Sequence, residues 1–420
     1  MYHIPKQIPM IQDIIESQDC VGCGACAEIC PKKCIELTVN KEGFKYPTIN
    51  TEQCINCKQC RKVCPALNSE KVKLPKGKVY AAVNKNHSIL MESSSGGIFS
   101  SISQFVLNHN GIVFGAAFDK NMILIHSSVD NKKDLERLRG SKYLQSDIQN
   151  VFKKIRKLIS EKRYVYFVGT SCQVAALKLF LKTDSEFLIT SDLICHGVPS
   201  PKAFNIFLKE IERKKNIKII QYKFRDKSIN GWNCSSSTAI AIDNKNNHIK
   251  KIYYNSIQNA YFTAFINGAL NRECCYKCKF TTEKRVSDIT LADFWGINMF
   301  SNKFHCDYGV SLVIINSDKG NKVFNDIKDT IIIQEATYEQ AKVINKCLYE
   351  STPRPNIRNH IYDNIDENPY SIIDPFIKKG IDTNYIKFII KKILRTNPKL
   401  YKILYTIKNK VNSSLKIRQA

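Results

Sequence analysis

Residues 20–31 read CVGCGACAEICP and residues 54–65 read CINCKQCRKVCP, so one cysteine pattern occurs twice. Both copies fit Cys-x2-Cys-x2-Cys-x3-Cys-Pro, in which three closely spaced thiolates hold one iron–sulfur cube and the fourth reaches the other cube. The pattern therefore predicts two 4Fe–4S clusters. The ligands of the first are Cys20, Cys23, Cys26 and Cys64, and those of the second are Cys54, Cys57, Cys60 and Cys30.

A zinc site and a disulfide framework are the alternative uses of these cysteines. Zinc usually takes four ligands in two Cys-x2-Cys pairs separated by a longer loop, whereas this chain has two sets of four. Disulfides belong to exported proteins, and residues 1–19 contain no apolar block or cleavage site typical of a signal peptide. Two complete matches to the pattern favour the clusters over both alternatives.

Length and composition indicate a globular protein with a redox role. The 420 residues suffice for about two or three domains, and a hydrophobic content of 43% is typical of a folded chain. Seventeen cysteines without an export signal indicate metal and redox use in a reducing cytosol, so we expect a cytoplasmic protein. The longest apolar stretch, residues 102–118, is interrupted by residues 108–110, so no membrane span is expected.

The net charge of +26 at pH 7 suggests an acidic partner. A specific nucleic-acid partner is not expected, because no zinc-finger, RNP or helix-turn-helix pattern accompanies the charge. An acidic redox protein, an anionic cofactor or a membrane surface fits better. Residues 385–420 carry ten basic and no acidic residues among interleaved apolar ones. This predicts a basic helical tail that either contacts the inner face of a membrane or packs on its own domain.

Alternating and continuous apolar stretches predict the secondary structure outside the cysteine runs. Residues 34–39 and 44–49 form a predicted hairpin, in which Cys34 is a small core residue. Residues 69–78 are polar and lysine-rich and are interpreted as a domain linker. Further strands are predicted at residues 79–83, 111–118, 122–129, 164–168, 187–194, 219–224, 238–242, 249–254 and 310–316, and helices at 98–107, 151–162 and 173–181.

Two glycine-containing segments are candidate anion sites. Ser94, Ser95, Gly96 and Gly97 precede a predicted helix, whose first N–H groups could bind a phosphate, although a plain flexible loop is the alternative. Gly169 and Thr170 begin the turn after the strand at 164–168, where backbone amides could hold a phosphate or a flavin pyrophosphate.

Four further cysteines suit a third 4Fe–4S cluster. Cys172 and Cys195 each follow a predicted strand, which places both on one edge of a parallel sheet, and Cys275 and Cys278 form a Cys-x2-Cys pair. Cys274 could replace Cys275. In the alternative interpretation these residues only pack. The remaining cysteines are predicted to be solitary and structural: Cys234, Cys306 and Cys347.

Seven stretches, in order along the chain, resemble the coenzyme F-420 hydrogenase/dehydrogenase beta-subunit family with a two-cluster ferredoxin domain fused in front. They are residues 92–99, 139–146, 169–177, 193–201, 224–227, 275–280 and 288–296. Departures occur at Ser171, where the family usually has proline, and at Ala176 and Ala292, where glycine is common.

The resemblance implies an α+β or α/β fold in three parts. These are a ferredoxin-type domain at residues 1–72, a mixed α/β flavin domain at 73–355 with parts at 73–160 and 161–355, and the basic helical tail at 356–420. The resemblance also implies an iron–sulfur flavoprotein that passes electrons between clusters, FAD and a hydride donor or acceptor. That partner is the deazaflavin coenzyme in archaeal members, and other substrates serve bacterial relatives, including those in cell-surface polysaccharide gene sets.

Roles for individual residues follow from the same resemblance. Lys142 is expected to stabilise negative charge on the reduced flavin, and residues 94–97 to lie near a phosphate or the ring edge. His196 is expected to donate a proton to the substrate, although a hydrogen-bonded structural histidine is the alternative. A ferredoxin-like protein or another redox partner would supply electrons. A second hypothesis is a non-catalytic electron-transfer subunit of a larger dehydrogenase.

Overall fold

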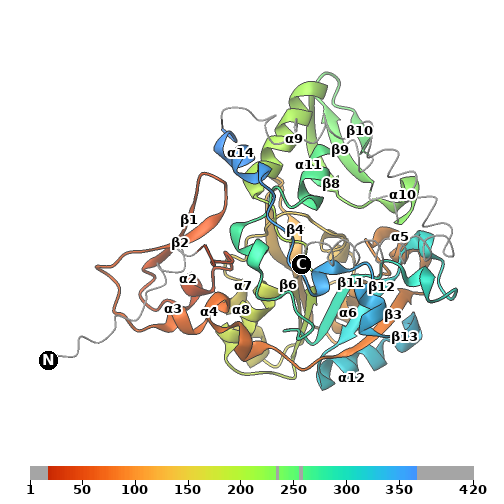
Figure 1. The fold of residues 1–420 in the computed structure, drawn as a ribbon, viewed down its shortest axis with the longest axis horizontal. Helices are drawn as coiled ribbons and strands as arrows, with labels where there is room; N and C mark the ends of the chain where they lie inside the picture. The colour runs from red at the N-terminus through yellow and green to blue at the C-terminus, as the bar shows by residue number, and fades with distance from the viewer. Residues whose placement is uncertain (1–17, 233–235, 255–258, 367–420) are drawn as a thin grey trace, which may run out of the picture.

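The computed structural model describes residues 18–232, 236–254 and 259–366 (Figure 1). The tail predicted over residues 385–420, and Cys234, lie outside the described residues. The described chain forms a small N-terminal unit, an eight-stranded mixed sheet covered by helices, and a three-stranded sheet. The predicted fold class, a ferredoxin-like unit followed by a mixed α/β unit, is confirmed.

The N-terminal unit contains the two cysteine runs on either side of a hairpin. Its elements are α2 (Ala25–Ile29), β1 (Ile35–Val39), β2 (Lys45–Ile49), α3 (Gln59–Lys62) and α4 (Pro65–Asn68). The strands β1 and β2 pair antiparallel with Ile35 opposite Ile49, so the predicted hairpin is confirmed. Pro65 is the first residue of α4, a position where a helix needs no N–H donor.

The large sheet has the strand order β13-β3-β12-β11-β7-β6-β4-β5. Its strands are β3 (Lys78–Asn84), β4 (Ile112–Phe118), β5 (Leu124–Val129), β6 (Val165–Thr170), β7 (Leu188–Leu193), β11 (Ile289–Asp293), β12 (Ser311–Ile315) and β13 (Ile331–Ala336). The central strands β4, β6, β7 and β11 run parallel, and antiparallel pairs flank them. The carboxyl ends of β6 and β7 therefore lie side by side, as predicted.

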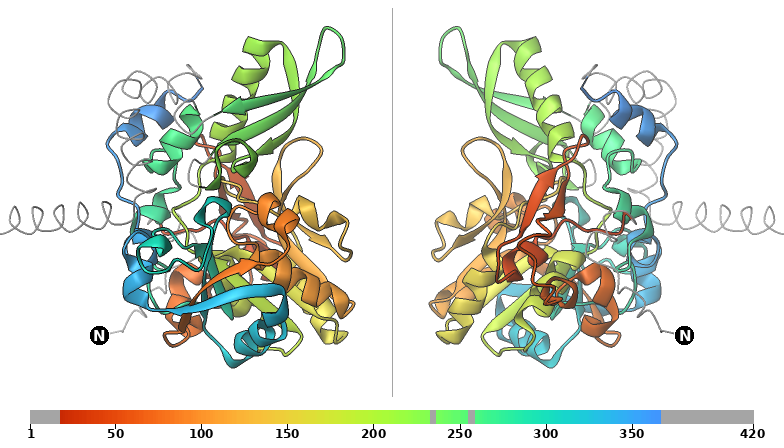
Figure 2. Two further views of the ribbon diagram at one scale, coloured as in Figure 1. Left: turned by 90° about the vertical axis from the view of Figure 1, so that its right-hand side faces the viewer. Right: turned by 90° about the vertical axis from the view of Figure 1, so that its left-hand side faces the viewer.

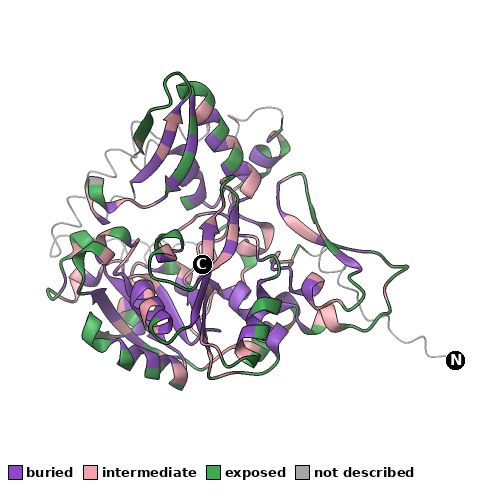
Figure 3. Cartoon of the chain, turned by 180° about the vertical axis from the view of Figure 1, so that it is seen from behind, coloured by how far each residue is buried: buried purple, intermediate pink, exposed green. Residues whose placement is uncertain are grey.

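Helices cover both faces of this sheet because its central strands are apolar on both sides. All of β12 is buried, and β7 is buried up to Leu193. Figure 3 shows that buried residues gather in the interior of the molecule, beneath the exposed faces of the helices. On one face, Tyr166 packs with α6 (Ile98–Asn108) and α12 (Asp318–Asp326). On the other face, Phe167 packs with α7 (Val151–Ser160) and α8 (Ser171–Leu181). The N-terminal unit lies against this second layer, where α2 and α4 contact α8.

The three-stranded sheet forms the far end of the molecule (Figure 2). It contains β8 (Ile217–Lys223), β9 (Ser237–Asp243) and β10 (Ile249–Tyr254), with α9 (Pro201–Lys215), α11 (Ala260–Ile266) and α14 (Ile357–Asp363) nearby. Phe44 from the N-terminal hairpin belongs to the same core as Tyr362 of α14, with ring centroids 6.1 Å apart. Helix α14, which the sequence analysis assigned to the tail, is thus packed against both units.

Short elements complete the described chain. They are α5 (His87–Glu92), α10 (Lys227–Asn230), α13 (Tyr338–Lys342) and the 3-10 turns η1 (Ser69–Val72), η2 (Asp134–Arg137), η4 (Glu273–Lys277), η5 (Ile297–Met299), η6 (Cys306–Tyr308), η7 (Lys328–Thr330) and η8 (Lys346–Leu348). The predicted linker at 69–78 therefore contains a helical turn, and the edge strand β13 has no counterpart in the sequence prediction. No helix in the described ranges is both long and apolar enough to cross a membrane.

Candidate functional site

The first group of cysteines joins the two runs in the way the pattern predicts. The thiol of Cys23 interacts electrostatically with those of Cys20, Cys26 and Cys64. Three of these side chains are nearly buried, with relative exposures of 8, 8 and 9% for Cys23, Cys26 and Cys64. Gly24 caps α2 with a φ of 74°, a left-handed conformation that glycine adopts without strain, and so turns the chain between two of the cysteines.

The second group lies at the surface. Cys30, Cys54, Cys57 and Cys60 line one cavity, which we call the rim cavity. Cys57 is exposed. Cys34, predicted to be a core residue, is only 4% exposed, but it also lines the rim cavity, with its Sγ 3.4 Å from that of Cys30. The structure thus brings together four thiols from both runs, with a fifth beside them.

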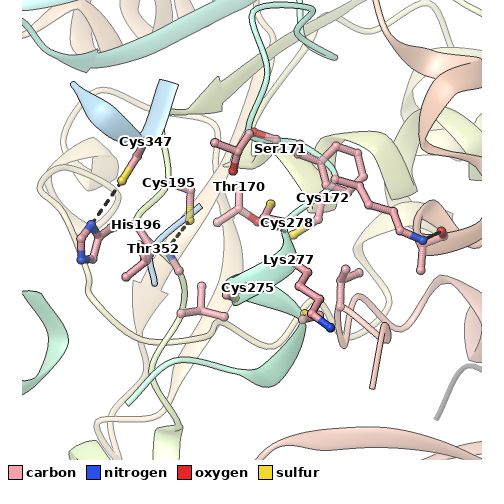
Figure 4. A pocket seen from close by; sticks show the side chains of 18 of the residues that line it. Thr170, Ser171, Cys172, Cys195, His196, Cys275, Lys277, Cys278, Cys347 and Thr352 are labelled. Atoms are coloured by element: carbon pink, nitrogen blue, oxygen red, sulfur yellow. Dashed lines mark hydrogen bonds between the residues drawn. The ribbon is translucent and has the colours of Figure 1, made fainter. Parts of the chain in front are cut away.

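The third group lines a second cavity, the cysteine cavity, at the carboxyl edge of the large sheet (Figure 4). Its six cysteines are Cys172, Cys195, Cys274, Cys275, Cys278 and Cys347. Cys172 is the second residue of α8, and Cys195 follows β7. The next three belong to η4 and the residue after it, and Cys347 lies in η8. All four predicted ligands therefore converge. The prediction that Cys347 is solitary was wrong, because η8 folds back onto this cavity.

The thiols of the cysteine cavity are close enough to influence one another. Cys278 interacts electrostatically with Cys172, Cys195 and Cys347. Burial raises the pKa of Cys195 to about 12, and burial also raises the pKa of Cys172. Cysteine binds metal as the thiolate, so such crowded, desolvated thiols need a positive charge among them to ionise. Iron would supply that charge.

The spacing of the cysteine side chains in these cavities suits a cluster better than a single ion. In the described part of the chain, no three His, Cys, Asp or Glu side chains are close enough to hold one metal ion. A zinc ion holds each sulfur about 2.3 Å away, whereas the iron and sulfide atoms of a cube keep the four cysteine sulfurs further apart.

A buried ion pair fixes the edge of the sheet next to the cysteine cavity. The Nη2 of Arg285 donates to Asp192 Oδ2 at 2.7 Å and to Ser171 Oγ at 2.8 Å. Asp192 at the end of β7 is fully buried, and it also accepts from the hydroxyls of Ser287 and Thr290. This network joins β7, the start of α8 and β11, so it holds Cys172 and Cys195 in register.

The three groups form a row. Cys26 of the first group interacts electrostatically with Cys60 of the second, and Cys20 of the first interacts with Cys274 of the third. Val21 and Ala66, neighbours of first-group ligands, line the cysteine cavity. The order along this row is therefore second, first and third group.

The turn predicted to bind a phosphate faces the cysteine cavity. Thr170 lines this cavity, and its Oγ1 lies 3.1 Å from Cys172 Sγ. Its amide donates to Gln173 Oε1 at 2.9 Å in the capping box of α8, so that donor is already used. Gly169 is the penultimate residue of β6. The cofactor-binding role of Gly169 and Thr170 stays a prediction.

His196 also lines the cysteine cavity, with both ring nitrogens engaged. Nε2 lies 2.8 Å from the carbonyl of Ile266, and Nδ1 lies 3.3 Å from the Sγ of Cys347. Burial lowers the pKa of His196, which favours the neutral ring. These contacts are those of a hydrogen-bonded structural histidine, the alternative given above. They do not support the proton-donor role, which stays a prediction.

Residues 93–97, the serine loop, are tied to the sheet by their polar groups. Ser94 Oγ accepts from the amide of Ser141 at 2.7 Å, and Ser95 Oγ donates to Val310 O at 2.9 Å. The Gly96 amide donates to Ser311 Oγ, and a Cβ on Gly96 would lie 2.3 Å from the carbonyl oxygen of Ala82. Gly97 caps α6, whose first-turn amides lack acceptors within the helix. The loop lines neither of the two cavities described above.

Lys142 lies near this loop but is turned toward the backbone. Its Nζ donates to the carbonyls of Arg137, Leu138 and Arg139 at 3.2, 3.0 and 2.8 Å. Burial lowers the pKa of Lys142 to about 7. Three bonds use all the donors of an ammonium group, so the expected flavin contact would require this side chain to move.

Four of the seven motif stretches meet around the serine loop. Arg139 pairs with Glu92 at 2.5 Å, and Arg225 pairs with Asp293 at 3.0 Å. Lys227 Nζ donates to three carbonyls, including that of Ser95 at 2.6 Å. Sequence reasoning identified these stretches but assigned no role to these five charged residues, because their contacts join segments more than 40 residues apart.

Two regions of the chain match known protein families. Residues 162–341 match the family described as the carboxyl-terminal part of the beta subunit of coenzyme F-420 hydrogenase/dehydrogenase, and residues 19–68 match the 4Fe–4S dicluster domain. A chain of the xenon-derivatised F-420-reducing nickel–iron hydrogenase complex from Methanosarcina barkeri is 16% identical, with a TM-score of 0.41 over 74% of this chain and 92% of that chain. No curated protein matches the chain.

The matched ranges contain the cysteine groups. Residues 19–68 hold the first two groups, and residues 162–341 hold five of the six cysteines of the third. Residues 162–341 are therefore similar to the carboxyl-terminal part of the coenzyme F-420 hydrogenase/dehydrogenase beta subunit, and a 4Fe–4S dicluster domain precedes this region.

Proposed function

We propose that this chain is an iron–sulfur flavoprotein oxidoreductase with three 4Fe–4S clusters and one FAD. The observation that carries the proposal is the row of cysteine groups, which leads from exposed Cys57 to the cavity at the carboxyl edge of the sheet. Cysteine thiolates are the ligands that such clusters use. A cluster carries one electron and a hydride two, so a flavin supplies the chemistry that pairs single electrons for hydride exchange with a deazaflavin or another organic substrate.

The residues around the serine loop would hold the flavin. The positive N-terminal end of α6 points out of this loop, and such a helix end favours an anionic group such as a pyrophosphate. Lys142 and Lys227 add positive charge nearby, and neither forms an ion pair with a carboxylate in the described part of the chain. The positive field at the start of α6 therefore suits the phosphates of FAD, and the amides of that helix end are the donors that would bind them.

Flavin content tests this assignment. Protein purified anaerobically and reconstituted with FAD is expected to hold about one flavin per chain. Replacing Gly97 by valine should remove the flavin and leave the iron content unchanged. The reason is that Gly97 has a φ of 82°, and a Cβ there would lie 3.0 Å from that of Asn84, so α6 would lose its cap.

The matched control is Gly115→Ala, because a Cβ at Gly115 meets only Leu138 atoms at 3.7 Å or more. The control should keep the flavin. Wild-type protein with full iron content and no flavin would overturn the flavin assignment and would instead favour the electron-transfer subunit.

The rim cavity is the proposed contact surface for the redox partner. Lys32, Lys58 and Arg61 line it, together with exposed Cys57, and no acidic residue is among its lining residues. Ile55, also on the rim, is 58% exposed. An apolar centre ringed by positive charge fits an acidic one-electron carrier of the ferredoxin kind.

Charge reversal at this surface should weaken the partner's binding. The double variant Lys32→Glu/Lys58→Glu is expected to raise the KM for an acidic ferredoxin about tenfold at low salt, and the difference should shrink at high salt, because exposed charges are screened. The control Lys223→Glu/Lys245→Glu makes the same charge change on the three-stranded sheet. Equal effects of both double variants would show that only net charge matters and that the rim is not the contact surface.

A further inference from the structure

Arg272 is a buried cation without a carboxylate partner. Its relative exposure is 0%, and in the described part of the chain it forms no ion pair with an aspartate or glutamate. Within the described ranges, two other arginines are buried to a similar extent, and both are paired: Arg285 with Asp192, and Arg358 with Glu42 and Glu273. Buried charges are costly unless they are paired, so Arg272 requires another source of negative charge.

The hydrogen bonds of Arg272 join three segments that meet between two cysteine groups. Nε donates to the carbonyl of Cys20 at 2.7 Å, and Nη2 donates to the carbonyl of Lys45 at 2.9 Å. Nη1 donates to Gln145 Oε1 at 3.1 Å, while the side-chain Nε2 of Gln145 donates to Val21 O at 2.9 Å. A Cβ on Gly22 would lie 2.8 Å from Nη1, so this loop closes directly over the guanidinium. The side chain is therefore held in one place.

The groups around Arg272 that can carry negative charge are cysteines. Cys20 of the first group and Cys274 and Cys275 of the third interact electrostatically with it. Tyr46 lies below the guanidinium, with 4.0 Å between Cζ and the ring centroid, but it is not the counter-charge, because a buried phenol stays neutral at physiological pH. The sulfur ligands of the first and third groups are therefore the remaining source of negative charge beside Arg272.

We propose that Arg272 is the fixed counter-charge of the first cluster and the positioning residue that aligns this cluster with the third group. The part that concerns the third group rests on the proposed function; the part that concerns the first cluster needs only the dicluster domain. Reduction adds one electron, and so one negative charge, to the cluster. A nearby fixed cation stabilises the reduced form and raises the potential.

The test is a redox titration of the full-length, anaerobically prepared protein, with dithionite as reductant and electron paramagnetic resonance as readout. The first cluster's signal is assigned by its loss in Cys26→Ser. In Arg272→Gln, reduction of this cluster should become at least tenfold less favourable, which is a fall of about 59 mV for one electron. Arg272→Lys keeps the positive charge and should change the equilibrium constant for this reduction less than threefold.

Arg358→Gln is the matched control, because Arg358 is also buried and also ties the N-terminal hairpin to the rest of the chain, through Glu42. This variant should change the equilibrium constant for reduction of the first cluster less than threefold. A second variant, Gln145→Glu, keeps Arg272 and places a carboxylate beside its Nη1. This variant should lower the potential of the first cluster, as Arg272→Gln does. Its control, Gln145→Met, should not lower that potential.

The outcomes separate this inference from the proposed function. An unchanged potential in Arg272→Gln, a tenfold effect in Arg272→Lys, or no effect of Gln145→Glu would overturn it. If Arg272→Gln fails to fold, the Arg272→Lys and Gln145→Glu variants still test the role of Arg272 in setting the potential of the first cluster. An iron content of about eight atoms per chain in the wild-type protein would refute the third cluster. The potential of the first cluster could still be measured in that protein.

Discussion

Replacing both Cys195 and Cys278 by serine is expected to lower the iron content from about twelve to about eight atoms per chain, because one of three 4Fe–4S clusters loses two ligands. Both residues line the cysteine cavity, and their thiols interact with each other. Turnover driven by the redox partner should fall to background, because electrons would have no carrier between the dicluster domain and the serine loop. Iron and sulfide analysis and the resonance spectra of the dicluster domain provide the readout.

The control is Cys306→Ser. Cys306 lines neither cavity, and its thiol lies 3.6 Å from the carbonyl oxygen of Phe304. This variant should keep the wild-type iron content and turnover. A double variant with unchanged iron would refute a cluster in the cysteine cavity.

Replacing Asp192 by asparagine is expected to lower the free energy of unfolding by about 3–5 kcal/mol, the usual cost of leaving one member of a buried ion pair alone. Arg285, 2% exposed, would keep its charge in an apolar surrounding with only hydroxyl and carbonyl partners. The same change should loosen the turn after β7, so the cluster of the third group should bleach at a lower urea concentration. Anaerobic urea titrations followed by circular dichroism and cluster absorbance measure both effects.

Asp184→Asn is the comparison for this prediction. Asp184 is 74% exposed and pairs with Lys319 at 2.7 Å. An exposed ion pair contributes about 1 kcal/mol or less to stability. The free energy of unfolding of this variant should therefore be close to that of the wild type. Equal stability of the two variants would contradict the role assigned to the Asp192 network.

The dicluster domain could be predicted from sequence because its ligand spacing is local. Three of four ligands of each cluster lie within seven residues of one another, and a proline marks the end of each run. The hairpin between the runs could be predicted for the same reason: its alternation and turn lie within 16 residues. The structure confirms the hairpin, and it places Cys64 with the first group and Cys30 with the second.

The third group could be predicted only in part. Cys172 and Cys195 follow two adjacent parallel strands, and this rule placed them together correctly. Cys347 carries no motif and reaches the cavity through η8, about 70 residues beyond Cys278, so no local pattern could indicate it. A cysteine that sequence reasoning calls solitary can still lie beside others after folding.

Lys142 and Arg272 show a second limit of prediction from sequence. Lys142 was singled out, yet its ammonium is satisfied by three backbone carbonyls. Arg272 was overlooked, although it joins the dicluster domain to the third group, because a single arginine beside a Cys-x2-Cys pair has no pattern. Long-range ion pairs and buried cations follow from the tertiary fold, and neither periodicity nor spacing encodes them.

The measurement that tests the account most directly is the iron and acid-labile sulfide content of anaerobically purified, full-length protein. Three 4Fe–4S clusters predict about twelve irons and twelve sulfides per chain. About eight of each, or fewer, in protein with its dicluster domain intact would contradict a row of three clusters that ends in the cysteine cavity.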